Sequence, residues 1–294
     1  MAGLKEIKRR LKSVQNTKKI TYAMKLVAAA KLQKVQEKVC ALQRYSKVLS
    51  QIFTETILAF EDKKIDLKLL EKRETIKNIR LIIIGGSRGL CAGFNTNLNK
   101  KISEVLASLK KNYPSANIEI YILGKKVVEF FRREKKTFSK VYDNLSDNVF
   151  DWPVEEILKE MEEDFLDNKV DKVFVLYTKF YSALSVMPTL EEVLPVKQEE
   201  MMIDATTDAA LKIFEPTKEK LLESLLPKFL KVKFLQIALN SNASENGSRM
   251  TAMDSATNNA SDLIDRLQLD FNKLRQSAIT SELLDIIGGA EALK

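Results

Sequence analysis

Both ends of the chain are long stretches that favour uninterrupted helix. Residues 3–59 contain no proline and no glycine after Gly3, and they are rich in Lys, Leu, Ala, Gln and Val. Mostly apolar residues recur there with a seven-residue period, which is typical of a coiled coil. The heptad positions are Leu4, Ile7, Leu11, Val14, Lys18, Thr21, Lys25, Ala28, Leu32, Val35, Val39, Leu42, Ser46, Leu49, Phe53, Thr56 and Phe60.

The last part of the chain carries the same pattern. Pro227 suits a first helical turn and predicts the start of a long helix there. From Pro227 to Ile287 this helix would have about 60 residues and a length of roughly 90 Å. Its heptad positions are Leu222, Leu225, Phe229, Val232, Gln236, Leu239, Ala243, Asn246, Met250, Met253, Thr257, Ala260, Ile264, Leu267, Phe271, Leu274 and Ala278.

A helix of this length with one apolar stripe must bury that stripe. The simplest solution is that the two ends wind around each other, and they run antiparallel because the intervening residues connect them. Small stripe residues such as Ala28, Ala243 and Ala260 allow a close approach. We therefore predict a long antiparallel coiled coil. The predicted segments are an N-terminal helix at 1–60, a linker at 61–75, an α/β domain at 76–215 and a C-terminal helix at 216–294.

The middle of the chain changes its pattern. Runs rich in β-branched residues predict strands, and helical patterns separate them. The predicted strands are the β-branched run that opens NIRLIIIGGSRGLCAGFN (78–95), NIEIYILG (117–124) and KVFVLYTKFYSA (172–183), and the predicted helices are 96–111, 125–136 and 152–167. The segment SVMPTLEEVLPV carries two prolines and suits an edge strand. Strands that alternate with helices predict a Rossmann-like α/β domain with a mostly parallel sheet.

The composition argues against several classes of protein. The chain has no histidine, which is the commonest general base and transition-metal ligand. Its two cysteines, Cys40 and Cys91, match no metal or redox spacing. No apolar run approaches the roughly 20 residues of a membrane span, and no signal-peptide core follows the basic N-terminus. We expect an intracellular soluble chain that needs no metal.

The positive charge belongs to one segment. Residues 1–60 carry 13 Lys and Arg against three acidic residues, whereas residues 216–294 carry ten of each. This indicates either an acidic partner for the N-terminal helix or a solvated face. Nucleic acid is a remote alternative, because few aromatic residues accompany the cations.

Two motifs invite a chemical interpretation. The glycine-rich turn at 85–89 follows a strand and precedes a helix, where α/β proteins bind phosphates. Its spacing matches neither the dinucleotide nor the phosphate-loop motif, so a tight turn is favoured and a nucleotide-binding enzyme is the alternative. Six acids of the predicted helix 152–167 invite an acid–base or metal interpretation, but a solvated face is favoured over a catalytic or metal site. They are Glu155, Glu156, Glu160, Glu162, Glu163 and Asp164.

Polar residues interrupt or flank both apolar stripes. The early patch is Lys18, Lys19, Thr21 and Lys25, and the late patch is Arg275, Gln276, Thr280 and Glu282. Polar groups on a seam cost stability unless they are paired, which indicates that both patches face a third body. In an antiparallel pair we expect the two patches to be neighbours.

Two long terminal motifs carry a family resemblance. IKRRLKSVQNTKKITYAMKLVAAAKLQK and SENGSRMTAMDSATNNASDLIDRLQLDFNKLRQSAITSELLDIIGGAEAL resemble the two ends of the gamma-subunit family of F-type ATP synthases. GLCAGFN resembles the motif after that family's first strand. The resemblance implies a rotor whose coiled coil threads a ring of alternating alpha and beta subunits. It also implies that the α/β domain contacts the epsilon subunit and the membrane ring of c subunits.

The resemblance implies further properties. ATP forms on beta, so the chain itself performs no catalysis and carries no cofactor. One copy serves each complex, peripherally, on the cytoplasmic face of the energy-coupling membrane, without inserting into it. The family usually has Asp where this chain has Ser87, and often Gly where it has Ala92. We expect only local effects in that loop.

The resemblance also implies roles for individual residues. Six positions match contacts with the beta subunit, and they are Met24, Lys25, Arg275, Gln276, Thr280 and Glu282. The first two match a pair near an acidic lever loop of beta, and the next two match a pair that hydrogen-bonds a catch loop. Glu245 and Arg249 match a charged pair lower on the shaft. Residues 283–294 match the tip that sits in an apolar collar of the ring.

Overall fold

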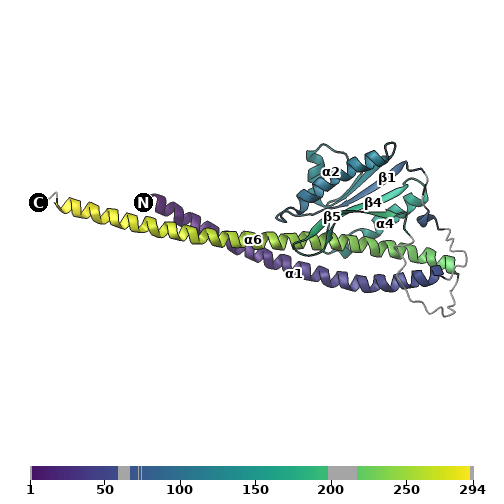
Figure 1. The fold of residues 1–294 in the computed structure, drawn as a ribbon, viewed down its shortest axis with the longest axis horizontal. Helices are drawn as coiled ribbons and strands as arrows, with labels where there is room; N and C mark the ends of the chain where they lie inside the picture. The colour runs from purple at the N-terminus through teal and green to yellow at the C-terminus, as the bar shows by residue number, and fades with distance from the viewer. Residues whose placement is uncertain (1, 59–66, 72, 74, 198–216, 292–294) are drawn as a thin grey trace. The chain divides into compact units, whose positions relative to one another are not determined.

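The two ends of the chain are long helices in the computed structural model. The structure describes residues 2–58, 67–71, 73, 75–197 and 217–291. Helix α1 spans Ala2–Leu58 and helix α6 spans Lys218–Glu291 (Figure 1). Every predicted heptad position from Leu4 to Thr56 is buried or half-buried, and α6 follows its predicted pattern as far as Phe271. Phe60 lies outside the described residues.

The predicted start of the second helix at Pro227 was wrong. Helix α6 begins nine residues earlier, after Thr217, whose hydroxyl oxygen accepts the Lys220 N–H at 3.3 Å. Proline removes one hydrogen bond inside a helix, here the bond to the Glu223 carbonyl. Pro227 and Glu223 both lie on the exposed side, where water can satisfy that carbonyl, while neighbours such as Leu226 are buried on the other side.

The residues cluster into two compact units. The helical unit consists of residues 1–30 and 249–294, and the sheet unit consists of residues 31–248. Both boundaries fall inside the long helices, so each unit contains part of α1 and part of α6. Residues 61–66 of the predicted linker lie outside the described residues, and Lys68–Leu70 forms a 3-10 turn, η1.

In both units α1 and α6 run antiparallel. In the helical unit the Thr21 and Thr257 hydroxyl oxygens lie 2.8 Å apart. One turn further along α1, Lys25 contacts Asp254, which lies one turn earlier on α6. In the sheet unit the Phe53 ring of α1 packs edge-to-face on a ring of α6. The predicted antiparallel pairing is therefore confirmed.

The sheet unit contains a five-stranded sheet in the order β3-β2-β1-β4-β5. Strands β1 to β4 are parallel, and β5 pairs antiparallel with β4 at the edge, as its two prolines predicted. The short strand β3 was not predicted. The strands are β1 (Asn78–Ile84), β2 (Asn117–Leu123), β3 (Lys140–Tyr142), β4 (Lys172–Phe180) and β5 (Val186–Leu194).

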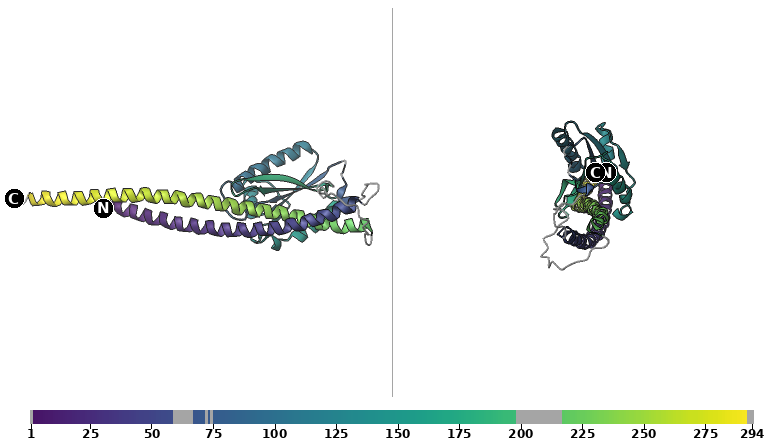
Figure 2. Two further views of the ribbon diagram at one scale, coloured as in Figure 1. Left: turned by 60° about the horizontal axis from the view of Figure 1, so that its bottom comes forward. Right: turned by 90° about the vertical axis from the view of Figure 1, so that its right-hand side faces the viewer.

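Helices cover both faces of this sheet (Figures 1 and 2). On one face α2 (Phe94–Asn112) and α3 (Lys125–Arg133) share a core with Leu81 and Ile83 of β1. Side chains alternate along a strand, so Arg80 points to the other face, where it contacts α4 (Val154–Leu166). A 3-10 turn, η2 (Val149–Asp151), precedes α4. No helix in the described part of the chain is long and apolar enough to cross a membrane.

The loop before α2 holds two residues in a conformation that side chains disfavour. Leu90 has φ 60° and Ala92 has φ 47°. The left-handed region costs an L-residue about 1–2 kcal/mol, and glycine avoids this cost. Ala92 is therefore a position at which a β-carbon strains the backbone.

Replacing Ala92 by glycine should stabilise the protein by about 0.5–1 kcal/mol, because relief of strain exceeds the added freedom of the unfolded chain. The matched control is Ala107→Gly at an exposed position of α2, where the same change should destabilise by about 1 kcal/mol. Urea unfolding measures both. A loss of stability in both variants would show that the loop is not strained.

Asp171 ties the starts of two central strands together. Its carboxylate accepts the N–H groups of Lys77 and Asn78 at 2.7 and 2.8 Å and pairs with Arg73 at 2.9 Å. Burial alone would raise the pKa of the Asp171 carboxyl, but the backbone N–H groups and the guanidinium hold the pKa below its ordinary value. The charged form is therefore favoured by folding.

Because folding lowers this pKa, Asp171 stabilises the protein fully above its unfolded pKa of about 3.9. The contribution is lost as the pH falls through the lower folded value. We expect Asp171→Asn to cost about 2–3 kcal/mol at pH 7 and to flatten the stability curve below about pH 4. Urea unfolding at several pH values measures this. An unchanged acid slope in the variant would contradict the assignment.

Candidate functional site

The carboxyl ends of β1 and β4 form the crevice in which open α/β sheets bind ligands. The chain passes from β1 to β2 and β3 on one side and then returns to β4 on the other, which makes this the topological switch point. Helix α6 occupies it. The Ser241 hydroxyl donates to the Ile84 carbonyl at 3.4 Å, and the Ser244 hydroxyl donates to the Thr178 carbonyl at 2.9 Å. Both serines are buried.

The glycine-rich turn after β1 packs against its surroundings. A β-carbon at Gly85 would lie 2.2 Å from Val127 Cγ2. One at Gly86 would lie 2.8 Å from Asn95 Oδ1 and 3.4 Å from Cδ of Glu245, the predicted shaft residue. The glycines therefore permit close packing of the turn, and a carboxyl group already lies against it. A phosphate would meet like charge there, so the tight-turn interpretation is favoured over nucleotide binding.

The hairpin between β4 and β5 also rests on α6. A β-carbon at Gly247 would lie 3.0 Å from Phe180 Cε2 and 3.4 Å from the Ala183 backbone. The Phe180 N–H donates to Asn240 Oδ1 at 3.4 Å. We call the contacts of Asn240, Ser241, Ser244 and Gly247 with the strand ends the α6 seat.

Our sequence reasoning did not identify the α6 seat. Ser241, Ser244, Gly247 and Ser248 recur at spacings of three and four, so they share one face of a helix. Such a run of small residues indicates a close approach of another backbone. The sequence alone does not say which backbone approaches.

Two residues of the early polar patch, Thr21 and Lys25, have partners inside the helical unit, while Lys18 is half-buried and Lys19 is exposed. Thr21 is buried and its hydroxyl donates to the Lys18 carbonyl, while the single proton of the Thr257 hydroxyl has two acceptors in reach, the Thr21 hydroxyl oxygen at 2.8 Å and the Met253 carbonyl at 2.7 Å.

Lys25 Nζ pairs with an Asp254 carboxylate oxygen at 2.6 Å, and both side chains stay partly exposed. Met24, beside Lys25, is half-buried. The sequence analysis did not predict a role for Asp254. Predicting which acid faces Lys25 across an antiparallel helix pair requires the register of the two helices.

The prediction that the early and late patches are neighbours was wrong. Lys25 lies opposite Asp254, and Arg275 lies about 21 residues further along α6, or roughly 30 Å at the rise of a helix. Continuing the register from the Thr21–Thr257 contact places Arg275 level with the first residues of α1. The late patch therefore stands near the end of the helix pair, and the early patch stands well inside it.

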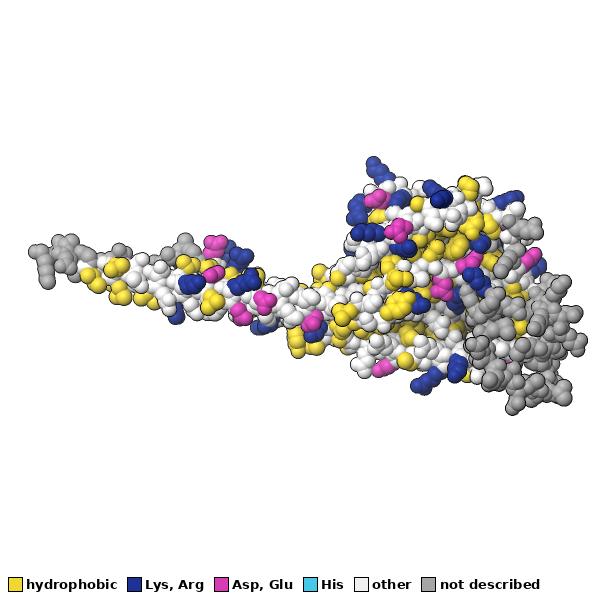
Figure 3. Space-filling model, viewed as in Figure 1, with side chains coloured by type: hydrophobic (Ala, Val, Ile, Leu, Met, Phe, Trp, Pro, Cys, Tyr) yellow, Lys and Arg dark blue, Asp and Glu magenta, His cyan; other side chains and the backbone are white. Residues whose placement is uncertain are grey.

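The late patch is exposed. Arg275 and Gln276 face solvent, and the Thr280 hydroxyl donates to the Gln276 carbonyl at 3.0 Å. Glu282 lies in α6, but its side chain is outside those described. Large apolar residues beside the patch are exposed as well. These exposed residues are Leu274, Ile279, Leu283, Leu284, Ile286 and Ile287. Figure 3 shows hydrophobic side chains on the surface of the helical unit.

Exposed apolar side chains in such number mark an interaction surface.

The predicted shaft pair is placed differently. Glu245 is half-buried, and its carboxyl group lies against Gly86 of the turn, while Arg249 is half-buried one turn further along α6. An ion pair between Glu245 and Arg249 stays a prediction.

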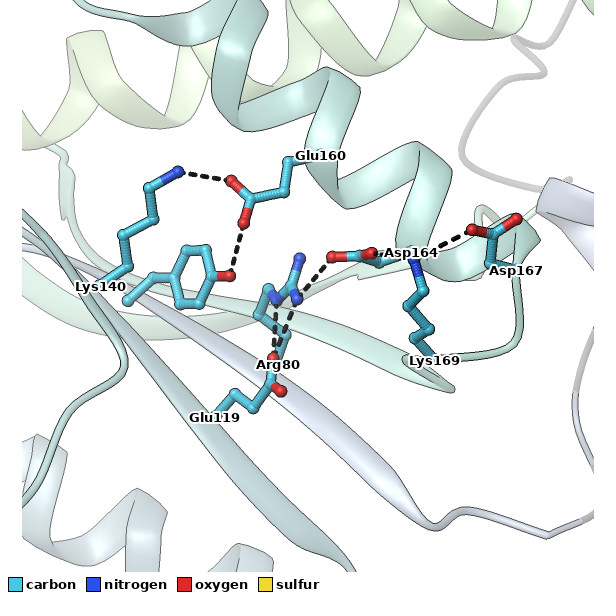
Figure 4. Close-up of polar contacts among 8 residues, drawn as sticks. Arg80, Glu119, Lys140, Glu160, Asp164, Asp167 and Lys169 are labelled. Carbon is cyan, nitrogen blue, oxygen red and sulfur yellow. Dashed lines mark hydrogen bonds and ion pairs between the residues drawn. The ribbon is translucent and has the colours of Figure 1, made fainter.

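A network of charges joins α4 to the sheet (Figure 4). Arg80 is buried and pairs with Glu119 at 2.9 Å and with Asp164 at 2.8 Å. Tyr121 donates to Glu160 at 2.8 Å, and Lys140 pairs with the same carboxylate at 2.7 Å. The prediction of a solvated face for the acids of α4 was therefore wrong for Asp164 and Glu160, which bond to strand residues.

The network holds its groups in their ordinary charge states. Burial and the bond to Glu160 raise the pKa of Tyr121, and the bond to Glu160 raises the pKa of Lys140. Burial would raise the pKa of Asp164, but its bonds with Arg80 and Lys169 hold it below the usual range. Each shift moves the pKa away from neutrality, whereas an acid–base catalyst needs a pKa near the working pH. This network is structural.

The described residues contain no cluster of three or more acidic or cysteine side chains that could hold a metal ion. The exposed apolar side chains of the helical unit form a contact surface. Comparison with known proteins bears on what this surface serves.

The sequence is similar to ATP synthase gamma chains over its whole length. The gamma chain of Geobacter metallireducens is 40% identical over 295 residues, and that of Christiangramia forsetii is 39% identical over 297 residues. Both alignments cover 100% of this chain and at least 99% of the relative. The family model described as ATP synthase matches residues 3–293. The chain belongs to the ATP synthase gamma-chain family.

Solved structures of ATP synthase rotors and central stalks share the fold. The rotor of the Euglena gracilis mitochondrial ATP synthase matches with a TM-score of 0.60 at 16% identity, covering 95% of this chain and 99% of that one. The central stalk and c-ring structure from Tetrahymena thermophila matches with a TM-score of 0.55 at 20% identity, covering 81% and 99%. At this identity the likeness shows the fold, and it confirms the predicted fold class of long terminal helices with a mostly parallel sheet.

The pairing of α1 with α6 can be tested by placing a charge in the seam. Leu267 is buried and Leu269 is 61% exposed on the same helix. We expect Leu267→Asp to cost about 3 kcal/mol or more, because it buries a charge without a partner, and Leu269→Asp to cost little. Circular dichroism during thermal unfolding measures both. Equal melting temperatures for the two variants would contradict the helix pairing.

Proposed function

We propose that this chain is the central-stalk rotor subunit of an F-type ATP synthase. It couples ion-driven rotation of the c ring to ATP synthesis and hydrolysis in the alpha–beta catalytic ring. Catalytic sites lie on beta, and this chain performs no bond chemistry. The observation that carries the proposal is the antiparallel helix pair whose α6 end leaves polar and apolar residues exposed, in a chain of the gamma family.

The physical properties of the helices suit a rotor. Two long helices wound as a coiled coil resist bending, and their unequal faces make the axle asymmetric. Exposed ion pairs such as Lys25–Asp254 are worth about 0–1 kcal/mol, so contacts of this kind break cheaply as the axle turns. Apolar side chains such as Leu284 make no directional bonds and can turn inside an apolar sleeve.

The proposal includes the partners and the site of action. The chain contacts alpha and beta along the helices, and epsilon and the c ring through the α/β domain, with one copy per complex. It binds peripherally on the cytoplasmic face of the energy-coupling membrane and needs no cofactor. The basic N-terminal segment suits an acidic lever on beta, and this attraction is screened beyond about 8–10 Å.

Individual residues take roles in the same proposal. The contacts with beta are made by Met24, Lys25, Arg275, Gln276, Thr280 and Glu282. Their separation along the helices, roughly 30 Å between Lys25 and Arg275, supports two distinct levels of contact. The Glu245–Arg249 pair belongs to the lower shaft.

Reconstitution tests the rotor function. Membranes with the complete enzyme should synthesise ATP from an ion gradient, and omission of this chain should abolish that synthesis. The isolated chain should hydrolyse no ATP. Gradient-driven synthesis without the chain would refute the proposal.

Charge reversal at Lys25 separates coupling from folding. We expect Lys25→Glu to lower the free energy of unfolding by about 1 kcal/mol or less, because the pair with Asp254 is partly exposed, and to reduce ion pumping per ATP hydrolysed more strongly. Thermal unfolding and a pumping assay measure the two effects. Arg275→Glu should reduce coupling in the same way.

The swapped variant Lys25→Glu with Asp254→Lys is the control. It restores an ion pair inside the chain but keeps the reversed charge at position 25. Coupling that stays low in the swap supports contact of Lys25 with beta. Coupling restored by the swap would assign Lys25 to the internal pair instead.

A further inference from the structure

Within the sheet unit, helix α6 contacts the sheet along one face. Ser241 and Ser244 donate to backbone carbonyls at the ends of β1 and β4, and Lys233 donates to the Glu192 carbonyl of β5 at 3.0 Å. These acceptors belong to the main chain of three strands. The bonds therefore hold the helix to the most rigid part of the domain.

The polar contacts of α1 with the domain are of a different kind. Lys31 pairs with Asp147 at 2.6 Å, with side chains 32% and 59% exposed, and Lys38 Nζ bonds Asn148 Oδ1. Both acceptors belong to one loop before α4. Partly exposed pairs of this kind contribute little, whereas the serine bonds are buried. The serine bonds thus reach the strands themselves, whereas these two contacts of α1 reach a loop.

Gly247 fixes the rotation of α6 about its own axis. The helix approaches Phe180 so closely there that a β-carbon would lie 3.0 Å from the ring. Rotation of the helix would move the side chain of Asn246 or Ser248 into this narrow space. The hairpin therefore holds α6 in one rotational orientation, while the two serine bonds fix its position along the helix axis.

From this geometry we propose that the α6 seat is where torque passes between the α/β domain and the axle, with Ser241, Ser244 and Gly247 as positioning residues. The inference rests on the proposed rotor function and deepens it. Torque from the c ring enters the α/β domain and leaves it through α6. The ligand crevice of the α/β fold acts here as a mechanical attachment.

The proposal separates two activities of the enzyme. In the soluble complex of alpha, beta and this chain, the catalytic ring turns the helices, and the α/β domain follows without load. In the membrane-bound enzyme the c ring resists rotation, and the load crosses the seat. A weakened seat should therefore reduce ion pumping per ATP while soluble ATP hydrolysis stays unchanged.

The experiment uses the complete enzyme with the double variant Ser241→Ala and Ser244→Ala. Each lost bond weakens the seat about fivefold, so we expect the number of ions pumped per ATP to fall about threefold or more. Gly247→Val, which crowds Phe180, should act in the same direction. The control is Ser224→Ala, an exposed serine of α6 whose hydroxyl bonds the Leu221 carbonyl at 2.8 Å, and it should change nothing.

The outcomes are distinct. A lower pumping ratio with unchanged soluble hydrolysis supports the proposal. A lower melting temperature with an unchanged ratio per assembled enzyme overturns it, because the serines would then serve folding alone. If Gly247→Val fails to assemble, the serine variant decides. If the unaltered chain fails to assemble with alpha and beta, the rotor function itself fails, and this result differs from every outcome above.

Discussion

Burial of one narrow apolar stripe on each terminal helix is the constraint on which the rest of the structure depends. A heptad repeat keeps the stripe on one side over the whole length of a helix, and only another long helix can cover it. The sole comparable stripe in this chain belongs to its opposite end. Because α1 pairs with α6, the residues between them must fold as an insertion. This insertion brings the chain back to the point where α6 can run antiparallel to α1.

In the inserted domain, the crevice at the strand ends, where such folds bind ligands, holds helix α6. A sheet of this topology offers strand-end carbonyls and a glycine-rich turn at the switch point. Here the hydroxyls of Ser241 and Ser244 satisfy two of these carbonyls, and the Glu245 carboxyl lies against the turn. A helix of the chain itself thus occupies the place of a small molecule. This explains how a fold common among enzymes can serve as an attachment for a helix.

The sequence predicts those features that short-range patterns determine. The heptad phase of α1 was predictable up to Thr56, and the central strands were predictable because β1 and β4 are continuous apolar runs. Strand β3 has three residues, too few for a pattern. The helix start was misplaced at Pro227 because the hydrogen bond that the proline removes lies on the exposed side of α6. Which side is exposed depends on tertiary packing and cannot be read from the local sequence. The α6 seat depends on which backbone approaches a row of small residues. No local sequence pattern predicts the identity of that backbone.

The axial register of the helices shows most clearly why a pattern can be correct and a site still misplaced. Because heptad stripes repeat, a slip of seven residues would set Thr21 against Met250 or Ile264, which are equally valid stripe positions. The observed register instead joins Thr21 to Thr257 and Lys25 to Asp254. Each bond is worth about 1 kcal/mol or less, yet apolar contacts barely distinguish the slipped alternatives. Weak polar pairs can thus select the offset, and the offset decides how far the α6 end extends beyond α1.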